Sequence, residues 1–294
     1  AQVQGHAAVV ADLDHSGGRE VAVVSQSAPG IQLWQPTAQG YVPVLDEALA
    51  EADPARTIRA TDVDHDGDLD LLTESGLFTA NGDGSWRRQM EGLEALSSDA
   101  ASVLPMDLDQ DRDRDLVVVG QQGLWVIRND RIWQWESLQI DDEPAQAVVG
   151  GDPNADGVVD LYVLRSTALD HFEVMRDLSM VRKNRTELKG IRSMMLADFS
   201  GDGRLELFCS GEGSAFVFSM DESAGVDGLL EQFNANASGV RPVTLEPEAG
   251  PGLLTVQPNG PHFWAPGEGR FPFASVDLTG EIDTGDSMRS NAEG

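Results

Sequence analysis

The chain has 294 residues, of which 50 are acidic and 20 are basic, so its formal net charge is -30. A field of that sign repels nucleic acid and anionic membrane surfaces, and we expect neither as a partner. The absence of an apolar run of 18 residues argues against membrane insertion by a helix, and a single cysteine, Cys209, excludes an intrachain disulfide.

One acidic motif recurs through most of the chain. It begins at Asp12, Asp62, Asp107, Asp152 and Asp198, in steps of 50, 45, 45 and 46 residues. The five copies read DLDHSGGRE, DVDHDGDLD, DLDQDRDRD, DPNADGVVD and DFSGDGRLE. One more step of 46 residues reaches Thr244, where TLEPEAGPG lacks the acid at both ends of the motif. We interpret this segment as a degenerate sixth copy of the repeat.

Each copy of the motif lies between segments that are typical of β-strands. Apolar stretches precede it at 7–11, 57–61, 101–106, 147–151 and 193–197, and β-prone runs follow it directly. Third runs, rich in aromatic residues, are found at 30–36, 76–86, 123–135, 168–175 and 214–220. A period of about 45 residues with three or four short strands is typical of β-propeller blades. The sequence therefore predicts an all-β fold, a β-propeller of four-stranded blades with six visible repeats and six or seven blades. Helical turns are expected only at 48–56 and 228–236.

The spacing of oxygen-bearing side chains in the motif favours calcium. They stand at positions 1, 3, 5 and 9, as in Asp62, Asp64, Asp66 and Asp70, and Gly67 at position 6 permits a sharp turn. Hard oxygen ligands on a tightly curled loop suit Ca²⁺ better than Zn²⁺, and Mg²⁺ prefers to keep its waters. The EF-hand is excluded, because it needs a glutamate at position 12. That position holds Val23, Thr73, Val118, Val163 or Cys209.

With these loops, the chain resembles the FG-GAP/VCBS repeats of integrin-α-like β-propellers, most clearly at Asp62 to Leu71. The resemblance implies that each loop joins the first two strands of a blade and binds one Ca²⁺ through positions 1, 3, 5 and 9. The implied side-chain ligands are Asp12, Asp14, Ser16 and Glu20; Asp62, Asp64, Asp66 and Asp70; Asp107, Asp109, Asp111 and Asp115; Asp152, Asn154, Asp156 and Asp160; and Asp198, Ser200, Asp202 and Glu206. Position 7 is expected to offer a backbone carbonyl, from Gly18, Asp68, Asp113, Val158 and Arg204.

Departures from the pattern grade the predicted sites. Arg112 replaces the glycine expected in the third loop. Ser16 and Ser200 are neutral ligands, so we expect the first and fifth loops to bind Ca²⁺ more weakly than the second. We expect four to five Ca²⁺ ions in all. The five loops contain 19 of the 50 acidic residues, and a cation would offset the repulsion among them.

Two regions are expected along the chain. Residues 1–276 form the propeller, with the degenerate copy near 244. Residues 277–294 leave the 45-residue rhythm, and their ASVDLTG and RSNAEG segments resemble the start of the ASPIC/UnbV domain that follows VCBS repeats in cartilage acidic protein-like proteins. This second resemblance implies a fragment of a longer chain with further domains.

The predicted function is that of an extracellular or periplasmic, adhesion-type interaction module that binds an unidentified protein or glycan. The resemblance places the partner surface opposite the calcium loops, at connections such as 46–56, 140–146 and 221–240. We expect no enzyme and no catalytic residues, because the sequence has no G-x-S-x-G, P-loop or dinucleotide motif. The alternatives are a polysaccharide lyase or hydrolase on the same scaffold, and a structural spacer. His15 and His65, at position 4 of their loops, are expected to face solvent.

Overall fold

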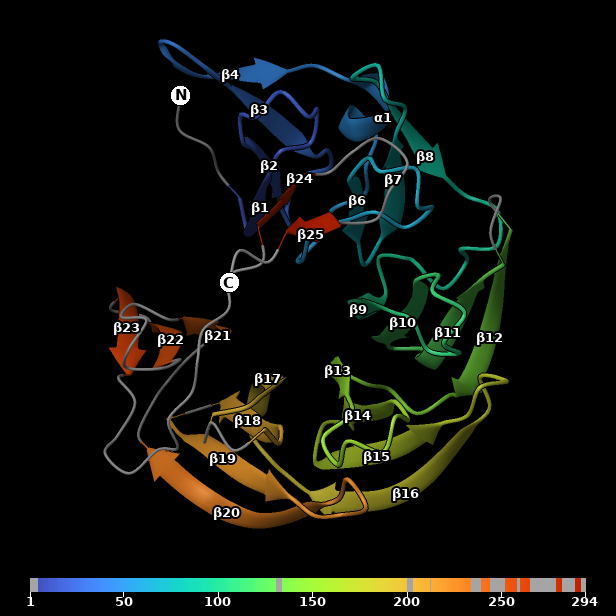
Figure 1. Ribbon diagram of the computed structural model, residues 1–294, viewed down its shortest axis with the longest axis vertical. Coiled ribbons are helices and arrows are strands. Elements are labelled where there is room, and N and C mark those ends of the chain that lie inside the picture. The colour runs from blue at the N-terminus through green and yellow to red at the C-terminus, as the bar shows by residue number, and fades with distance from the viewer. Residues whose placement is uncertain are drawn as a thin grey trace. The chain divides into compact units, whose positions relative to one another are not determined.

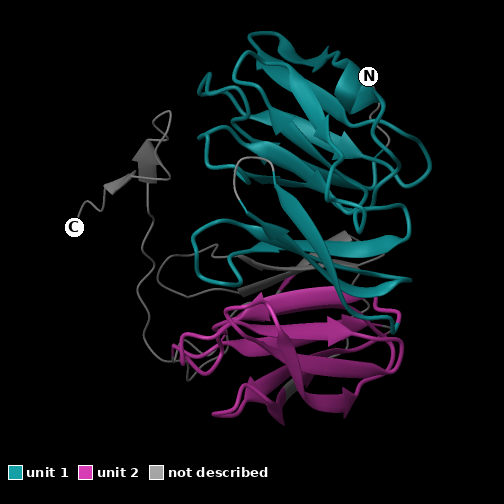
Figure 2. Ribbon diagram, turned by 90° about the vertical axis from the view of Figure 1, so that its right-hand side faces the viewer, with its two compact units in different colours: residues 1–143, 278–294 teal, residues 144–277 magenta. Residues whose placement is uncertain are grey.

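The computed structural model describes residues 5–130, 134–199, 203–211, 213–233, 239–243, 252–257, 260–264, 279–281 and 289–291. Their regular secondary structure is almost entirely β-strand, with one short helix, α1 (Glu47–Ala50) (Figure 1). The chain divides into two compact units, residues 1–143 with 278–294 and residues 144–277 (Figure 2). Within the described ranges, no helix is long and apolar enough to cross a membrane.

The first unit contains three four-stranded antiparallel sheets, whose strands follow one another in chain order. The first sheet has β1 (Ala7–Ala11), β2 (Glu20–Val24), β3 (Gln32–Thr37) and β4 (Gly40–Val44). The second has β5 (Arg59–Thr61), β6 (Asp70–Thr73), β7 (Gly76–Ala80) and β8 (Trp86–Gln89). The third has β9 (Ala100–Met106), β10 (Asp115–Gly120), β11 (Gly123–Asn129) and β12 (Trp135–Asp141). A two-stranded ribbon pairs β24 (Thr279–Glu281) with β25 (Arg289–Asn291).

The second unit contains two more sheets of the same kind and a smaller one. The fourth sheet has β13 (Ala147–Gly151), β14 (Asp160–Leu164), β15 (Ala168–Val174) and β16 (Met180–Glu187). The fifth has β17 (Ile191–Ala197), β18 (Glu206–Gly211), β19 (Ala215–Met220) and β20 (Val226–Phe233). The degenerate sixth copy contributes a three-stranded sheet of β21 (Gly239–Val243), β22 (Gly252–Gln257) and β23 (Gly260–Trp264). Five four-stranded sheets at the five acidic motifs confirm the predicted blades.

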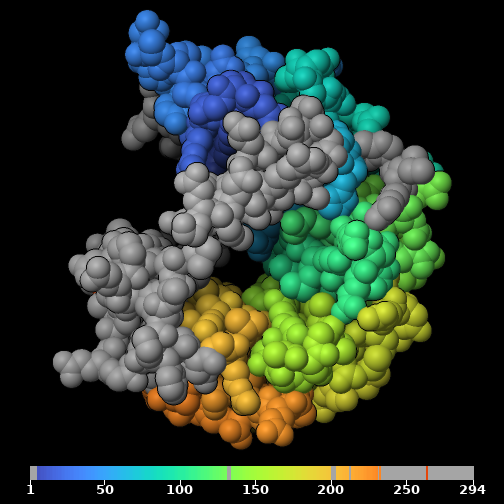
Figure 3. Space-filling model, in the orientation of Figure 1, coloured from blue at the N-terminus to red at the C-terminus, as the bar shows by residue number. Residues whose placement is uncertain are grey.

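The strands of a blade differ in exposure according to their order. The second strands β6, β10, β14 and β18 are buried at every position, which explains their nearly continuous apolar sequences. The fourth strands are the most exposed: β4 and β16 have no buried residue, and β16 (yellow) lies at the surface in Figure 3.

Neighbouring blades share apolar cores within each unit. One core joins Leu33 of the first blade to Leu71 and Phe78 of the second. Another joins the second blade to the third, and in the second unit Tyr162 and Leu207 belong to a core between the fourth and fifth blades. This packing holds each acidic loop at the end of a rigid strand pair.

The predicted helical turn at 48–56 is confirmed only in its first residues, as α1, and the turn predicted at 228–236 is wrong over its described part. Asp46 caps α1 by accepting a hydrogen bond from the Leu49 N–H, and its second oxygen accepts one from Trp86 N of β8. Residues 228–233 instead belong to β20, and residues 234–236 lie outside the described residues. There, pairing with β19, with two shifts of register, overrides the local helical preference.

Candidate metal centres

The acidic loops join the first and second strands of their blades and share one backbone conformation. Position 6 has a positive φ in all five loops, at Gly17, Gly67, Arg112, Gly157 and Gly203. Position 4 has one as well in the four loops where it is described, at His15, His65, Gln110 and Ala155. Arg112 therefore adopts, at φ 79°, a conformation that glycine takes without strain. In the first three loops this path brings alternate side chains toward one centre.

The first aspartate of each loop fixes this turn. Its Oδ2 atom accepts a hydrogen bond from the position-6 N–H in every loop, at 3.0, 3.3, 3.2, 2.8 and 3.0 Å in chain order. The side chain at position 3 accepts from the N–H of position 5 in the first four loops, and the side chain at position 5 accepts from the N–H of position 7. The loops are thus shaped by their own side chains.

The acid at position 9 is buried in all five loops, with exposed fractions of 0 to 4% at Glu20, Asp70, Asp115, Asp160 and Glu206. In four of the loops it accepts a hydrogen bond from the N–H at position 2, at Leu13, Val63, Leu108 and Phe199. Asp70 and Asp115 each accept a second backbone N–H, from Ala80 and Asn129 of the third strand. Position 9 therefore clamps the loop onto its blade.

Three of the loops gather carboxylate oxygens closely enough for one ion. The clusters are Asp12, Asp14 and Glu20; Asp62, Asp64 and Asp70; and Asp107, Asp109 and Asp111. In each, one oxygen from every residue lies within 4.8 Å of the others. Oxygens at about 2.3–2.6 Å from a shared Ca²⁺ lie at most about 5 Å apart, so the spacing fits this ion.

The same atom is left without a hydrogen bond in each of these three loops. Among the described residues, Oδ1 of Asp12, Asp62 and Asp107 is buried and has no hydrogen-bond partner, whereas Oδ2 binds the backbone. A buried carboxylate oxygen without a donor is unfavourable unless a cation satisfies it. A Ca²⁺ ion bound at these atoms would supply the positive charge that they lack.

Burial and mutual repulsion raise the pKa values of several loop carboxyls. Burial raises the pKa of Asp70 to about 8 and that of Asp115 to about 7. The pKa of Asp64 rises to about 6, first through burial and then through the charge of Asp66. Burial also raises the pKa values of Glu20 and Asp109. The ionised loops are therefore under electrostatic strain that a cation would relieve.

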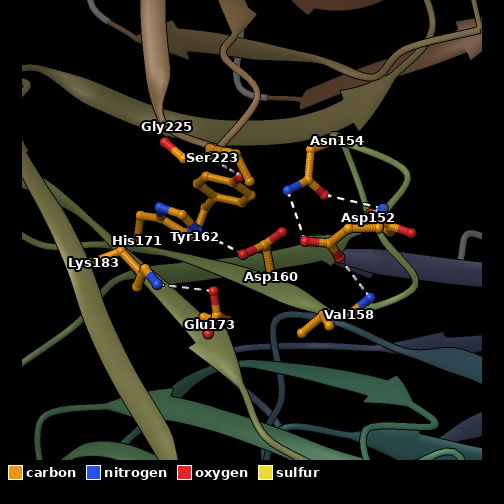
Figure 4. A network of polar contacts seen from close by, with 12 residues as sticks. Asp152, Asn154, Val158, Asp160, Tyr162, His171, Glu173, Lys183, Ser223 and Gly225 are labelled. Atoms are coloured by element: carbon orange, nitrogen blue, oxygen red, sulfur yellow. Dashed lines mark hydrogen bonds and ion pairs between the residues drawn. The ribbon is translucent and has the colours of Figure 1, made fainter.

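The fourth loop does not form such a cluster. Both oxygens of Asp152 accept backbone hydrogen bonds, from Asp156 N at 3.0 Å and from Gly157 N at 2.8 Å. The amide of Asn154 and the carboxylate of Asp160 bind protein groups, which Figure 4 shows. The sequence motif predicts the fourth loop as a calcium site like the others and does not reveal these protein partners.

The fifth loop is described only in part. Asp198, Arg204 and Glu206 lie within the described residues, whereas the predicted ligands Ser200 and Asp202 lie outside them. Phe199 N donates to Glu206 Oε2 at 2.6 Å, as in the first three loops. Of the sixth copy, positions 244 to 251 also lie outside the described residues.

The two loop histidines connect neighbouring loops. His15 and His65 are exposed, as expected, but His15 Nε2 also lies 2.9 Å from Asp68 Oδ1 of the second loop. His65 Nε2 lies 3.5 Å from Asp113 Oδ1 of the third loop. In both cases position 4 of one loop contacts position 7 of the next, which a single repeat cannot predict.

Comparisons with known proteins identify the fold. No protein-family model and no curated protein matches the chain. One similar solved structure is a lectin from Agrocybe aegerita, described as recognising non-reducing terminal N-acetylglucosamine: TM-score 0.53, 15% identity, covering 78% of this chain and 66% of that chain. The Dos1 propeller has a TM-score of 0.53 at 13% identity, covering 87% and 66%. BBS1N, solved in complex with ARL6DN, has a TM-score of 0.56 at 10% identity, covering 98% of this chain and 87% of that chain.

These likenesses and the five four-stranded sheets define the class of protein as a β-propeller. At 10 to 15% identity they show the fold alone. The chain spans about two thirds of the lectin and Dos1 chains.

Proposed function

We propose that the chain is a calcium-binding β-propeller of the FG-GAP/VCBS type that acts as a non-catalytic interaction module. The acidic loops of the first three blades hold Ca²⁺, and the fifth loop is a further candidate.

The observation that carries the proposal is the unpartnered Oδ1 atom of Asp12, Asp62 and Asp107, found at the same position in three loops of the described chain. Each of these residues belongs to a cluster of three acids. Repetition at equivalent positions argues for one shared ligand, and the all-oxygen donor set favours Ca²⁺ over Zn²⁺.

We infer a ligand class from the similar propellers and a compartment from the charge. Similar propellers include a lectin and a structure solved in a protein complex, which supports a glycan or protein ligand for this chain. Calcium sites of extracellular modules work at about 10⁻⁴–10⁻³ M Ca²⁺. Such a concentration outside the cytoplasm would occupy the loops, and three or four ions would reduce the formal charge from -30 to -24 or -22. We therefore place the protein in an extracellular or periplasmic setting.

Asp66→Ala tests the metal role of a single loop. An ion bound at one hundred times its Kd contributes about 2.7 kcal/mol, so we expect a loss of up to that size in calcium. In EGTA the loss should be small, because Asp66 is exposed and its Oδ1 only accepts from Asp68 N. Thermal unfolding in both buffers measures the difference.

Glu94→Ala provides the control, because Glu94 is an exposed acid between the second and third blades and outside the acidic loops. It should change the midpoint little in either buffer. An equal loss for Asp66→Ala with and without calcium would show that Asp66 is not a ligand.

A further inference from the structure

The fourth loop departs from the others first at position 2. Pro153 has no N–H, so it cannot make the bond that Leu13, Val63, Leu108 and Phe199 donate to position 9. The imidazole of His171 replaces this donor. Its Nε2 lies 2.7 Å from Asp160 Oδ1, and because a carboxylate only accepts, His171 donates.

The second departure is at position 3. Asn154 turns its amide nitrogen toward Asp156 Oδ2, at 2.9 Å, so these two predicted ligands face each other as donor and acceptor. A calcium ligand would present its oxygen instead. The first aspartate is also satisfied, since Asp152 Oδ1 accepts from Asp156 N. The donors of the protein thus occupy oxygens that an ion would need.

The third departure is that the loop reaches the neighbouring blade. The amide nitrogen of Asn154 also donates to the Glu222 carbonyl at 3.2 Å. Buried Tyr162, which follows Asp160 by two residues, donates its hydroxyl to the Ala224 carbonyl. Both carbonyls belong to the turn between β19 and β20, which Asp221 shapes by accepting from Ser223 N and Gly225 N.

The histidine and the tyrosine also support each other. Their rings stack with centroids 5.1 Å apart and an interplanar angle of 11°. Both side chains are buried, and the chain of contacts runs from Asp160 through His171 and Tyr162 to the turn of the fifth blade (Figure 4). The fourth loop is therefore bonded by protein groups of its own blade, through His171, and of the fifth blade, through the Glu222 carbonyl.

We propose that the fourth loop is a calcium-free clasp that fastens the fourth blade to the 221–225 turn of the fifth. In this loop His171 replaces the backbone donor of position 2, and N–H groups of the protein, including the amide of Asn154, occupy oxygens that the ion would bind elsewhere. The inference deepens the proposed function and rests on it, because it divides the acidic loops into calcium sites and one protein-bonded joint.

Calcium stoichiometry of two matched variants tests the clasp. Asp66→Asn and Asp156→Asn each neutralise position 5, in the second and fourth loops respectively. Equilibrium dialysis of the full chain against CaCl₂ should show one ion fewer for Asp66→Asn and an unchanged number for Asp156→Asn. Loss of one ion in Asp156→Asn would overturn the clasp and leave the calcium function standing.

A second measurement remains decisive even if no loop binds calcium. Asn154→Ala should lower the thermal midpoint by the same amount in CaCl₂ and in EGTA, and by more than Asn184→Ala, which alters an exposed strand residue. A loss confined to CaCl₂, or one no larger than that of Asn184→Ala, would overturn the clasp. Zero bound ions in the unaltered protein would instead contradict the proposed function.

Discussion

Chelation should destabilise the protein strongly. We expect EGTA to lower the free energy of unfolding by about 2.7 kcal/mol for each loop whose ion is present at one hundred times its Kd. The physical reason is the burial and clustering of carboxylates. Burial first, and then the charges of Asp64 and Asp66, raise the pKa of Asp70 to about 8. In the described structure, Asp12, Asp62 and Asp107 each have an unpartnered buried oxygen.

Thermal unfolding in CaCl₂ and in EGTA measures this effect, with MgCl₂ as the control. Magnesium retains its waters and demands octahedral geometry, so it should restore little of the lost stability. The loss of stability in EGTA should be greatest in the unit formed by residues 1–143, which holds all three clusters found in the described chain. Identical midpoints in the three buffers would contradict the account.

Asp170→Ala should be the most damaging single substitution among the charged residues. Asp170 is fully buried in β15, and its Oδ2 lies 3.0 Å from Nε of Arg165, which is 2% exposed. Arg182 and Arg185 of β16 also contact it, at 3.5 and 3.3 Å. Removing the carboxylate leaves a buried guanidinium without this counter-charge. We expect a loss of about 3–5 kcal/mol in chemical denaturation.

Glu173→Ala is the matched control on the same two strands. Glu173 pairs with Lys183 at 3.0 Å, but the two side chains are 27% and 41% exposed. A solvent-exposed pair of this kind contributes about 0–1 kcal/mol. Replacing Arg165 and Asp170 together with Met and Leu should recover much of the loss, because no buried charge is then left without a counter-charge. Equal losses for Asp170→Ala and Glu173→Ala would refute the buried-pair interpretation.

The repeat made the fold predictable from the sequence. Steps of about 45 residues between acidic loops located the blades, and the predicted first strands 7–11 and 147–151 agree with β1 and β13. Such agreement arises because local alternation, turn residues and blade period all favour one structure. The helical turn predicted at 228–236 was wrong because the pairing of β20 with β19 outweighed a weak local helical preference.

The loops were predictable only where their ligands are local. The positions of Asp62, Asp64 and Asp70 follow from spacing, and the structure brings them together. The contacts of the fourth loop depend on His171, eleven residues beyond Asp160 on another strand, and on the turn of the next blade. Pro153 was the one signal in the sequence, since it alone removes the position-2 donor.

Isothermal titration of the chelator-stripped protein with CaCl₂ tests the central claim most directly, because it counts the ions. The sequence predicts four to five. With the fourth loop as a clasp, the account predicts three ions from the first three loops and a fourth if the fifth loop also binds. Zero or one bound ion would contradict it, and the acidic loops would then be solvated turns.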